Sequence, residues 1–549
     1  MTELAARIEE LLAARVCPDE PGIAVGVYRD GELAEQVCAG LAVVEHGVPV
    51  SADTLFDIAS ASKHFTAACL LLLQRDGLLD LGDDVRRHVP ELALREPVTL
   101  RQCLTHTGGL REYYTLCAIS GVPLPGITED RLLRLISGQQ DLDFAPGSAY
   151  SYSNTGYVLA AVAIRRLTGK SVAAFAAERI FGPLEMSRTH FRHDLGALVP
   201  GLATGYAPDP AATGRFRRAD PVEEVVGDGG IVTSVRELAA WHAFLLTGHG
   251  LGTDIRDGLL PRAVLTGGRA LEYANGLAHT TEAGQAGYGH TGAISGFRSA
   301  LLCLPGAGLG VSVLANRVDL YPARVARWVA RLALGVPAEA DRTDPVSVEV
   351  AEPARAGLLG RWHDSELDVF VRFEPGADGR LEHPGPGGER TRFALAGDGC
   401  WYGEGAAVSV ALQLDQGRTD GDRLLVRPAI GDDDYGTLER APTVASLPPG
   451  SDVWPRGRYF SSELDAYATF DPAAGADSSR EPAVTIGLNR PWRLAPAGPD
   501  VYVADDWLTL RFADAGRTLL ISEAGARRVR FSRVAGEDGP APGFIRGLR

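Results

Sequence analysis

The sequence predicts a mixed α/β domain followed by two antiparallel all-β barrel domains. A chain of 549 residues is too long for one hydrophobic core, so several domains are expected. Strand and helix patterns alternate in the first part, whereas helical periodicity disappears beyond residue 354 and short β-rich runs alternate with Gly, Pro and Asp turns. The β-rich part also contains a repeat, because 360-GRWHDSELDVFVRF-373 and 457-GRYFSSELDAYATF-470 share seven of 14 positions.

The first domain is expected to span residues 1–338. It begins with an amphipathic helix pattern, after which GIAVGVYRDGELAEQVCAGLA predicts two strands joined by a turn at Asp30–Gly31. Helical patterns then dominate over residues 65–184. The sequence further predicts two strands over 298–316 and a last helix over 321–335.

The second and third domains are expected over residues 355–445, as a lipocalin-like barrel, and over 452–536. The Pro-, Glu- and Asp-rich run 336–354 predicts a linker before them, and 441-APTVASLPPGSDVWP-455 predicts the break between them. We interpret the repeat as a structural corner shared by two barrels rather than as catalytic, because the surrounding strand pattern is the one that barrels require.

Composition excludes several classes of partner. The formal net charge of −16 disfavours binding to nucleic acid and to anionic membranes. No signal peptide is recognisable, and no run of about 18 uncharged apolar residues predicts a membrane span. The seven cysteines are scattered without C-x-x-C spacing, as in proteins of reducing compartments. We therefore expect a cytoplasmic protein with no nucleic-acid or membrane partner.

The stretch 56-FDIASASKHFTAACLLLLQ-74 contains the first candidate for chemistry. Lys63 and Lys170 are the only lysines among 54 lysines and arginines. Ser60 precedes Lys63 by three residues, so a helix places both side chains on one face. An unprotonated lysine can take the proton of a serine hydroxyl, whereas arginine, with a pKa above about 12, cannot. The alternative is an ordinary surface lysine at the start of a helix.

Two further stretches carry polar candidates. In 144-FAPGSAYSYSNTGYVLAA-161 the Tyr152 phenol could pass a proton to a leaving group, and the Asn154 amide could bind a substrate carbonyl; the alternative is a tyrosine-rich turn. In 286-AGYGHTGAISGFRSALL-302, small residues around His290 let a backbone approach a ligand and offer N–H groups to an oxyanion; the alternative is a glycine-rich hairpin with an incidental histidine.

Taken together, S-x-x-K, Y-x-N and H-T-G occur in the order found in the penicillin-recognising serine hydrolases. Y-S-N is similar to the middle motif of class C β-lactamases, and H-T-G stands where K-T-G would make a true β-lactamase. Over most of its length the chain resembles the D-stereospecific aminopeptidases of the penicillin-binding-protein/class C β-lactamase superfamily. Further motifs that carry this resemblance are 107-TGGLREYYTLC-117 and 227-GDGGIVTS-234.

The resemblance implies a β-lactamase-like catalytic domain of α/β (α+β) class before the two barrels. It implies that Ser60 is acylated and that Lys63 and Tyr152 handle protons. The substrate would lie against Asn154, His290, Gly292 and Ala293, with the main-chain N–H groups of Ser60 and Ala293 as the oxyanion hole. Small D-amino-acid amides, esters or short peptides are the implied substrates. No cofactor or metal is expected, and a homodimer is one expected assembly.

One stretch departs from the family. In the aminopeptidases a long loop of the last barrel brings an acidic side chain to the cleft. The matching stretch here, 483-AVTIGLNRPWRLAPAGPD-500, is short, carries Arg490 and has no acidic residue before Asp500. Because arginine prefers anionic partners, Arg490 is a candidate to bind a carboxylate of the substrate. The alternative is a solvated basic hairpin that never reaches the cleft.

Other functions remain to be separated from hydrolysis. The acyl group could pass to an amine, as in a transacylase or peptide cyclase, or the enzyme could be an esterase of a biosynthetic pathway. The β-lactamase-like domain could also be an inactive scaffold for two binding modules. A metal site in 190-HFRHD-194 is an alternative to a surface loop there, and the loop is preferred. No G-x-S-x-G, H-E-x-x-H or P-loop motif occurs.

Overall fold

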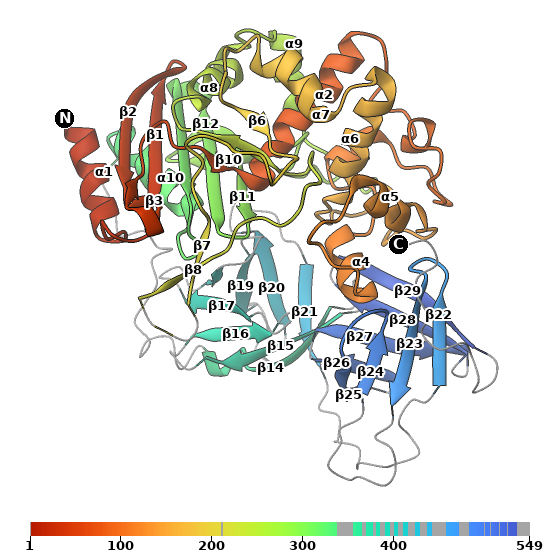
Figure 1. The fold of residues 1–549 in the computed structure, drawn as a ribbon. Coiled ribbons are helices and arrows are strands. Elements are labelled where there is room, and N and C mark those ends of the chain that lie inside the picture. Colours follow the sequence, from red (N-terminus) through yellow and green to blue (C-terminus); the bar gives the residue numbers. More distant parts are fainter. Residues whose placement is uncertain are drawn as a thin grey trace.

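A computed structural model gives the fold of the chain (Figure 1). It describes residues 2–209, 212, 214–336, 355–364, 369–376, 380–384, 390–395, 400–404, 410–414, 423–428, 436–441, 457–471, 483–498, 500–505, 507–514, 517–523 and 525–534. The expected linker 336–354 and the expected break 441–455 lie almost entirely outside these residues. The first domain lies above two barrels that sit side by side (Figure 1).

The first domain is built on an antiparallel sheet that joins the two ends of its chain. The strand order is β10-β11-β12-β13-β1-β2, so the first strand of the sequence pairs with the last, with Val25 opposite Val313. The strands are β1 (Ile23–Arg29), β2 (Glu32–Ala39), β10 (Ala278–Glu282), β11 (Gln285–Ile294), β12 (Phe297–Leu304) and β13 (Leu309–Ala315).

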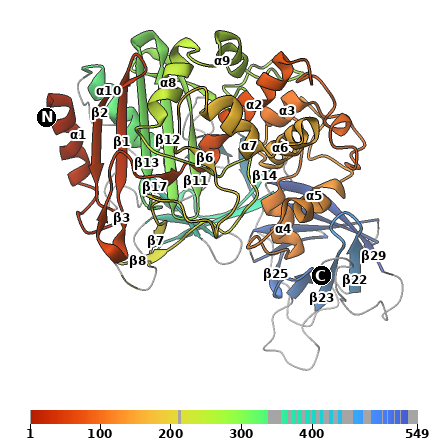
Figure 2. The ribbon, with the colours of Figure 1, turned by 45° about the horizontal axis from the view of Figure 1, so that its top comes forward.

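Both faces of the sheet are covered, because alternate residues of each strand enter different cores. On β12, Leu302 and Leu304 pack with helices α1 (Glu3–Ala13) and α10 (Pro322–Ala333), whereas Leu301 enters the larger core on the helical side. Helices α2 and α8 lie on that second side of the sheet (Figure 2). The helices of this side are α2 (Lys63–Arg75), α3 (Leu100–Leu104), α4 (Tyr113–Ser120), α5 (Glu129–Ser137), α6 (Thr155–Thr168), α7 (Val172–Ala176), α8 (Leu238–Thr247) and α9 (Thr253–Leu259).

Helix α2 is the central helix of the domain. Its residues from Lys63 to Leu73 are all buried, which explains the apolar run that follows Lys63 in the sequence. A small sheet leads into it, in which β5 (Phe56–Asp57) pairs with β9 (Ile231–Thr233). The other short strands are β3 (Leu41–Val43), β4 (Val48–Pro49), β6 (His190–Phe191), β7 (Tyr206–Pro208) and β8 (Phe216–Arg218).

Two closed antiparallel barrels follow, each with eight strands in sequence order. The first contains β14 (Gly360–Asp364), β15 (Val369–Pro375), β16 (Leu381–Pro384), β17 (Arg390–Leu395), β18 (Trp401–Glu404), β19 (Val410–Leu414), β20 (Arg423–Pro428) and β21 (Gly436–Arg440). The second contains β22 (Gly457–Ser461), β23 (Ala466–Asp471), β24 (Ala483–Ile486), β25 (Trp492–Gly498), β26 (Val501–Ala504), β27 (Leu508–Ala513), β28 (Thr518–Glu523) and β29 (Ala526–Arg533).

The sequence repeat is the first hairpin of each barrel. Gly360 pairs with Phe373 in one barrel, and Gly457 pairs with Phe470 in the other, at matching places in the repeat. The first strand also closes each barrel against the last one. The predicted fold class, a mixed α/β domain followed by two antiparallel barrels, is confirmed.

Helix α4 belongs to the first domain and packs against the second barrel. Its side chains Leu116 and Ile119 are fully buried in the core of that barrel, together with Leu464 and Ile486. In both ribbon views α4 lies against the barrel's strands (Figure 1; Figure 2). The start of α4 belongs to the site described next, so this barrel packs on an element of the site.

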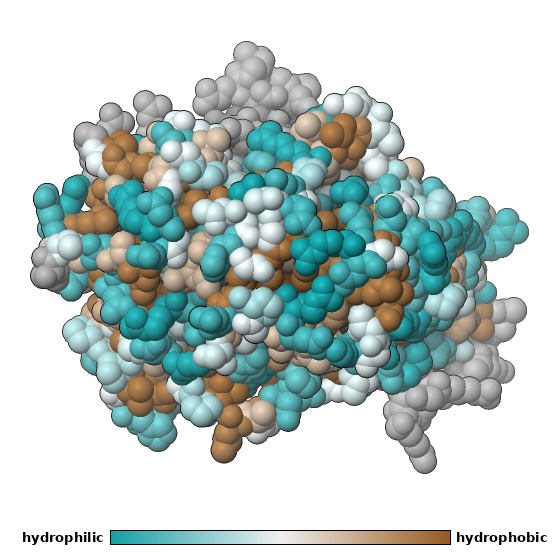
Figure 3. Space-filling model, turned by 90° about the horizontal axis from the view of Figure 1, so that it is seen from above, coloured by the Kyte–Doolittle hydropathy of each residue, from teal (hydrophilic) through white to brown (hydrophobic). Residues whose placement is uncertain are grey.

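On the face seen from above, the hydrophobic residues that the structure describes lie in groups among hydrophilic ones (Figure 3). Within the part of the chain that the structure describes, no helix is both long enough and apolar enough to span a membrane.

Candidate active site

Ser60 lies in a 3-10 turn, η2 (Ala59–Ser62), that joins β5 to helix α2. The residue before it, Ala59, has a φ of 50°, a left-handed conformation that is strained for a residue with a Cβ. The buried carboxylate of Asp57 accepts a hydrogen bond of 2.7 Å from the Ala59 N–H and holds the chain in this shape. The strained turn presents the half-buried Ser60 at the head of the helix.

Lys63 is fully buried and its ammonium has three acceptors. Nζ lies 3.1 Å from Ser60 Oγ, 2.7 Å from Asn154 Oδ1 and 2.6 Å from the main-chain oxygen of Asp228. The amide and main-chain oxygens can only accept hydrogen bonds, whereas a hydroxyl can also donate one. When Lys63 loses a proton, its two remaining N–H groups suit these two oxygens and its lone pair suits the Ser60 O–H. The geometry therefore favours proton transfer from Ser60 to Lys63.

The surroundings of Lys63 bring its pKa close to neutrality. Burial lowers the pKa from 10.5 to about 8, although the carboxylates of Asp228 and Glu112 oppose the shift. The rings of Tyr152 and Tyr157 lie nearby, with centroids 5.0 and 5.3 Å from Nζ. An appreciable fraction of Lys63 is therefore neutral near pH 8, which suits a general base.

Tyr152 lies beside this pair as a neutral phenol. Burial raises its pKa well above the ordinary value, although the adjacent Ser60 hydroxyl opposes the shift. Its ring packs on that of His106 with centroids 4.2 Å apart. At neutral pH Tyr152 therefore holds a proton that it can donate.

Asn154 precedes helix α6, and its amide is held by a carboxylate. The side-chain Nδ2 donates a 3.0 Å hydrogen bond to Glu112 Oε1, and the main-chain N–H of Asn154 donates to Glu112 Oε2. Glu112 therefore fixes which way the amide points and leaves its oxygen toward Lys63. Burial raises the pKa of Glu112 to about 7, although the hydrogen bonds from Asn154 oppose the shift.

Asp228 completes the surroundings of Lys63. Its main-chain oxygen accepts from Lys63, and its side-chain Oδ2 accepts a 3.1 Å hydrogen bond from the Tyr113 hydroxyl. Gly227 beside it has a φ of 123°, and a Cβ there would lie 2.8 Å from the Cβ of Ala161. The glycine-rich run 227–230 thus passes close to helix α6.

His290 is neutral in this site. Its Nδ1 lies 2.5 Å from the main-chain oxygen of Thr291, which can only accept, so Nδ1 carries the proton and Nε2 accepts the 2.8 Å hydrogen bond from the Tyr273 hydroxyl. Burial and, to a smaller extent, the nearby charge of Lys63 lower the pKa of His290 to about 3, although the hydrogen bond to the Thr291 oxygen opposes the shift. His290 therefore cannot supply the positive charge that the lysine of K-T-G supplies.

An edge of strand β11 packs against the segment before Ser60. Strand β10 begins at Ala278, opposite Gly289, so residues 291–294 of β11 pair only with β12, on one side. A Cβ on Gly292 would lie 2.0 Å from the main-chain oxygen of Ile58, so this contact requires glycine. Ala293 follows on the same strand, which packs against η2, and its N–H remains the predicted second donor of the oxyanion hole.

The structure does not bring Arg490 to the other predicted residues. Its side chain is 69% exposed and lies 3.9 Å from the carboxylate of Asp505. The neighbouring Asn489 donates hydrogen bonds of 2.9 and 3.0 Å to the main-chain oxygens of Ala118 and Ile119, at the end of α4 away from Tyr113. The hairpin over 483–500 therefore docks on the far end of α4, because its turn caps that helix.

Four residues of the site were not singled out from the sequence: Glu112, Asp228, Tyr273 and His106. Glu112 and Asp228 stand inside the quoted motifs 107–117 and 227–234. Asp228 directly precedes the pair Gly229–Gly230, and this was the available signal for it; Glu112 carries no comparable signal. His106 accepts a 3.1 Å hydrogen bond from the Ser153 N–H, and burial lowers its pKa well below the ordinary value. These residues hold the predicted ones in place.

Among the described residues, no group of three or more His, Cys, Asp or Glu side chains is arranged to hold a metal. In 190–194, the Nδ1 atoms of His190 and His193 lie 3.0 and 3.3 Å from the main-chain oxygens of Arg188 and Phe191.

Comparisons with known proteins agree with this geometry. A family model described as Beta-lactamase matches residues 4–335. The D-aminopeptidase of Gluconobacter oxydans (strain 621H) is 29% identical over 535 residues, covering 94% of this chain and 96% of its own. That of Brucella anthropi (strain ATCC 49188) is 27% identical over 492 residues, covering 88% of this chain and 87% of its own.

Two solved structures share the fold. The octameric penicillin-binding protein homologue from Pyrococcus abyssi superposes with a TM-score of 0.56 at 22% identity, covering 79% of this chain and 99% of that one. The D-stereospecific amidohydrolase from Streptomyces sp. gives a TM-score of 0.51 at 22% identity, covering 61% of this chain and 99% of that one.

Proposed function

Since the chain belongs to the β-lactamase family, we propose that it is a serine hydrolase that acts through an acyl-enzyme on small D-amino-acid amides, esters or short peptides. The resemblance read from S-x-x-K, Y-x-N and H-T-G is confirmed at the level of this family. The single observation that carries the chemistry is the contact of 3.1 Å between Lys63 Nζ and Ser60 Oγ, with Lys63 fully buried.

The proposed acylation step uses three side chains. Neutral Lys63 takes the hydroxyl proton of Ser60 while Oγ forms a bond to the substrate carbonyl carbon. The main-chain N–H groups of Ser60 and Ala293 stabilise the oxyanion. When the carbon–nitrogen or carbon–oxygen bond breaks, Tyr152 gives its proton to the leaving group and regains one from the Lys63 ammonium. Lys63 is then neutral again.

Deacylation repeats these steps with water as the nucleophile. Water loses a proton to Lys63 and attacks the ester carbonyl; the bond to Ser60 Oγ then breaks, and Oγ takes a proton back from the Lys63 ammonium. The Asn154 oxygen accepts a hydrogen bond from Lys63, and we propose that the side-chain amide of Asn154 also binds the acyl group of the substrate. The result is a free acid and an unchanged enzyme.

The substrate class rests on the relatives. The curated relatives reported above are D-aminopeptidases that match nearly the full length of the chain. A neutral His290 in place of a lysine removes a cation that would bind a substrate carboxylate, which fits amides and esters better than penicillins. We therefore place D-amino-acid amides and esters first.

The test combines labelling with a substrate panel. Ser60→Ala should abolish turnover and labelling by a fluorophosphonate. Ser62→Ala is the matched control, because the Ser62 hydroxyl accepts a 3.1 Å hydrogen bond from the Ile231 N–H and lies outside the mechanism. Full turnover in Ser60→Ala would show that Ser60 is not the nucleophile. A panel of D- and L-amino-acid p-nitroanilides and esters, with free and blocked amines, identifies the substrate, and product analysis with an added amine separates hydrolysis from acyl transfer.

Two further predictions accompany this function. A homodimer is one predicted assembly, and a measurement of the molar mass in solution tests it. A cytoplasmic location also stays a prediction; it rests on the seven free cysteines and is tested by fractionation of the source cells.

A further inference from the structure

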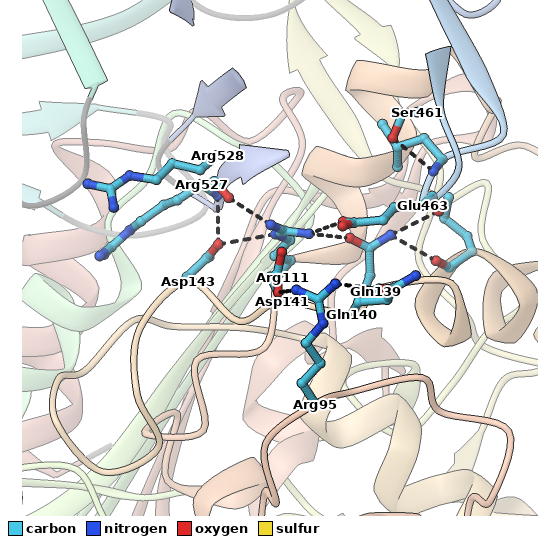
Figure 4. Close-up of polar contacts among 12 residues, drawn as sticks. Arg95, Arg111, Gln139, Gln140, Asp141, Asp143, Ser461, Glu463, Arg527 and Arg528 are labelled. Carbon is cyan, nitrogen blue, oxygen red and sulfur yellow. Dashed lines mark hydrogen bonds and ion pairs between the residues drawn. The ribbon is translucent and has the colours of Figure 1, made fainter. Parts of the chain in front are cut away.

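A buried arginine lies where the first domain meets the second barrel. The side chain of Arg111 is 1% exposed and forms an ion pair with Glu463, and its Nε lies 3.5 Å from Asp143 Oδ1. Its remaining donors reach Gln139 Oε1 at 2.8 Å and the main-chain oxygen of Arg527 at 3.0 Å (Figure 4). A buried cation needs such partners, because losing one leaves an uncompensated charge.

The partners of Arg111 come from both sides of this interface. Asp143 and Gln139 belong to the first domain, whereas Glu463 and Arg527 belong to the second barrel. Glu463 is the glutamate of the second copy of the sequence repeat. The Arg527 N–H also donates a 2.6 Å hydrogen bond to Asp143 Oδ1, so Asp143 binds the barrel as well.

The next residue, Glu112, is held by the same barrel. Its main-chain N–H donates a 2.6 Å hydrogen bond to the oxygen of Gly525, in the turn between β28 and β29. A Cβ on Gly525 would lie 2.8 Å from the Cβ of Glu112, so these two segments are packed closely. One turn further, Thr115 donates a 2.9 Å hydrogen bond to Glu523.

The same segment reaches the candidate active site on its other side. The main-chain oxygen of Arg111 accepts a 2.7 Å hydrogen bond from the Thr155 hydroxyl, and Glu112 binds both N–H groups of Asn154. Asn154 in turn accepts from Lys63. Hydrogen bonds thus run from the second barrel to the lysine without a gap.

We propose that Arg111 is a positioning residue, which locks the second barrel against residues 111–112 so that Glu112 holds Asn154 in register with Lys63. The inference rests on the proposed role of Lys63 as base, and it makes the barrel part of the catalytic apparatus. Displacing a catalytic group by about 1 Å can cost about 100-fold in rate, so small movements of this segment matter.

The test removes the barrel's charge without touching the site. Glu463→Gln keeps the shape of the side chain but ends its ion pair with Arg111. Glu382→Gln is the matched control: Glu382 is also a buried barrel glutamate, paired at 3.1 Å with Arg390 and at 3.4 Å with Arg392. Asp143→Asn is the milder second variant, since its amide oxygen can still accept from the Arg527 N–H.

Two readouts are measured well below the melting temperature. We expect Glu463→Gln to slow acylation of Ser60 by an activated ester about tenfold and to move the titration midpoint of Lys63. That midpoint is followed by NMR of [6-13C]lysine, with Lys170 as the internal reference. Asp143→Asn should act in the same direction, and Glu382→Gln should leave both readouts unchanged.

The outcomes separate this inference from the proposed function. Unchanged acylation and an unchanged Lys63 midpoint in Glu463→Gln and Asp143→Asn would overturn the positioning role, even if the melting temperature falls. If Glu463→Gln does not fold, Asp143→Asn alone decides. If wild-type Ser60 is not acylated at all, the proposed function fails, while the lysine titration still decides whether the barrel positions Lys63.

Discussion

Glu112 accepts both hydrogen bonds that Asn154 can donate toward it, one from the main chain and one, of 3.0 Å, from the side-chain amide. This fixes the amide with its oxygen 2.7 Å from Lys63 Nζ. The oxygens of Asn154 and Asp228 then accept two of the hydrogen bonds of Lys63 Nζ, and its third hydrogen-bonding position faces Ser60. The base is therefore aimed at the nucleophile by groups that take no part in bond making.

Replacing Lys63 by arginine tests whether this site needs a base or only a cation. Lys63→Arg keeps the charge, but a guanidinium stays protonated, so we expect kcat to fall by about 10²- to 10⁴-fold. Hydrolysis of an amino-acid p-nitroanilide measures the loss. Lys170→Arg is the control, because Lys170 lies on the surface in an ion pair with Glu178. Wild-type turnover by Lys63→Arg would make the lysine dispensable.

The pH dependence of kcat/KM should follow the titration of Lys63. Its base form accepts the proton of Ser60, so activity should rise with pH and level off above about 8, the pKa that burial produces. Below this value the fraction of free base falls about tenfold for each pH unit.

Glu112→Gln should shift this profile in a defined direction. The carboxylate of Glu112 raises the pKa of Lys63, so its removal should move the acidic limb to lower pH. The plateau should fall as well, because a glutamine amide has one acceptor oxygen for the two N–H groups of Asn154. Glu282→Gln is the control, because Glu282 is also a buried carboxylate; it pairs with Arg327 of helix α10. A limb that moves to higher pH would contradict the assigned electrostatics.

The contact between strand β11 and the segment before Ser60 can be tested with one methyl group. Gly292→Ala would place a Cβ 2.0 Å from the Ile58 oxygen, so the strand must move; we expect a loss of about 1–3 kcal/mol in stability. Acylation of Ser60 should slow as well, because Ala293 moves with the strand. Gly267→Ala is the control, since no atom lies within 4 Å of its Cβ position. Equal melting temperatures and rates for both variants would argue against the close contact.

Arg490→Ala should leave activity within about twofold of the wild type, because the side chain is exposed and lies beside Asp505. KM values for substrates with and without a carboxylate measure this. A selective rise in KM for the carboxylate substrates would show that Arg490 reaches the cleft after all.

The sequence predicted those features that follow from local periodicity. A serine three residues before a lysine on an apolar helix is enough to expect the contact between Ser60 and Lys63. The repeat and the turn pattern likewise predicted two barrels. Tyr152, Asn154 and His290 were candidates from the chemistry of their own stretches. Only the family resemblance joined them to Ser60 and Lys63 in one site, because their separation along the chain exceeds any local period.

Contacts between distant segments could not be predicted from the sequence. Glu112 reaches Asn154 across 42 residues, and Glu463 reaches Arg111 across 352. The repeat was interpreted as a structural corner alone, yet its second copy supplies Glu463 to the interface. Arg490 was expected near the substrate because its hairpin matches a loop that enters the cleft in the family. Here the hairpin caps helix α4 instead, which only the docking of the barrel determines.

An NMR titration of Lys63 in the intact protein tests most directly whether this lysine is the base for Ser60. The chain has two lysines, so [6-13C]lysine labelling gives two resonances, and Lys170→Arg assigns them. We expect the Lys63 resonance to titrate near pH 8, because burial lowers its pKa from 10.5. A Lys63 midpoint near 10.5 would contradict the claim that this buried lysine is the base for Ser60.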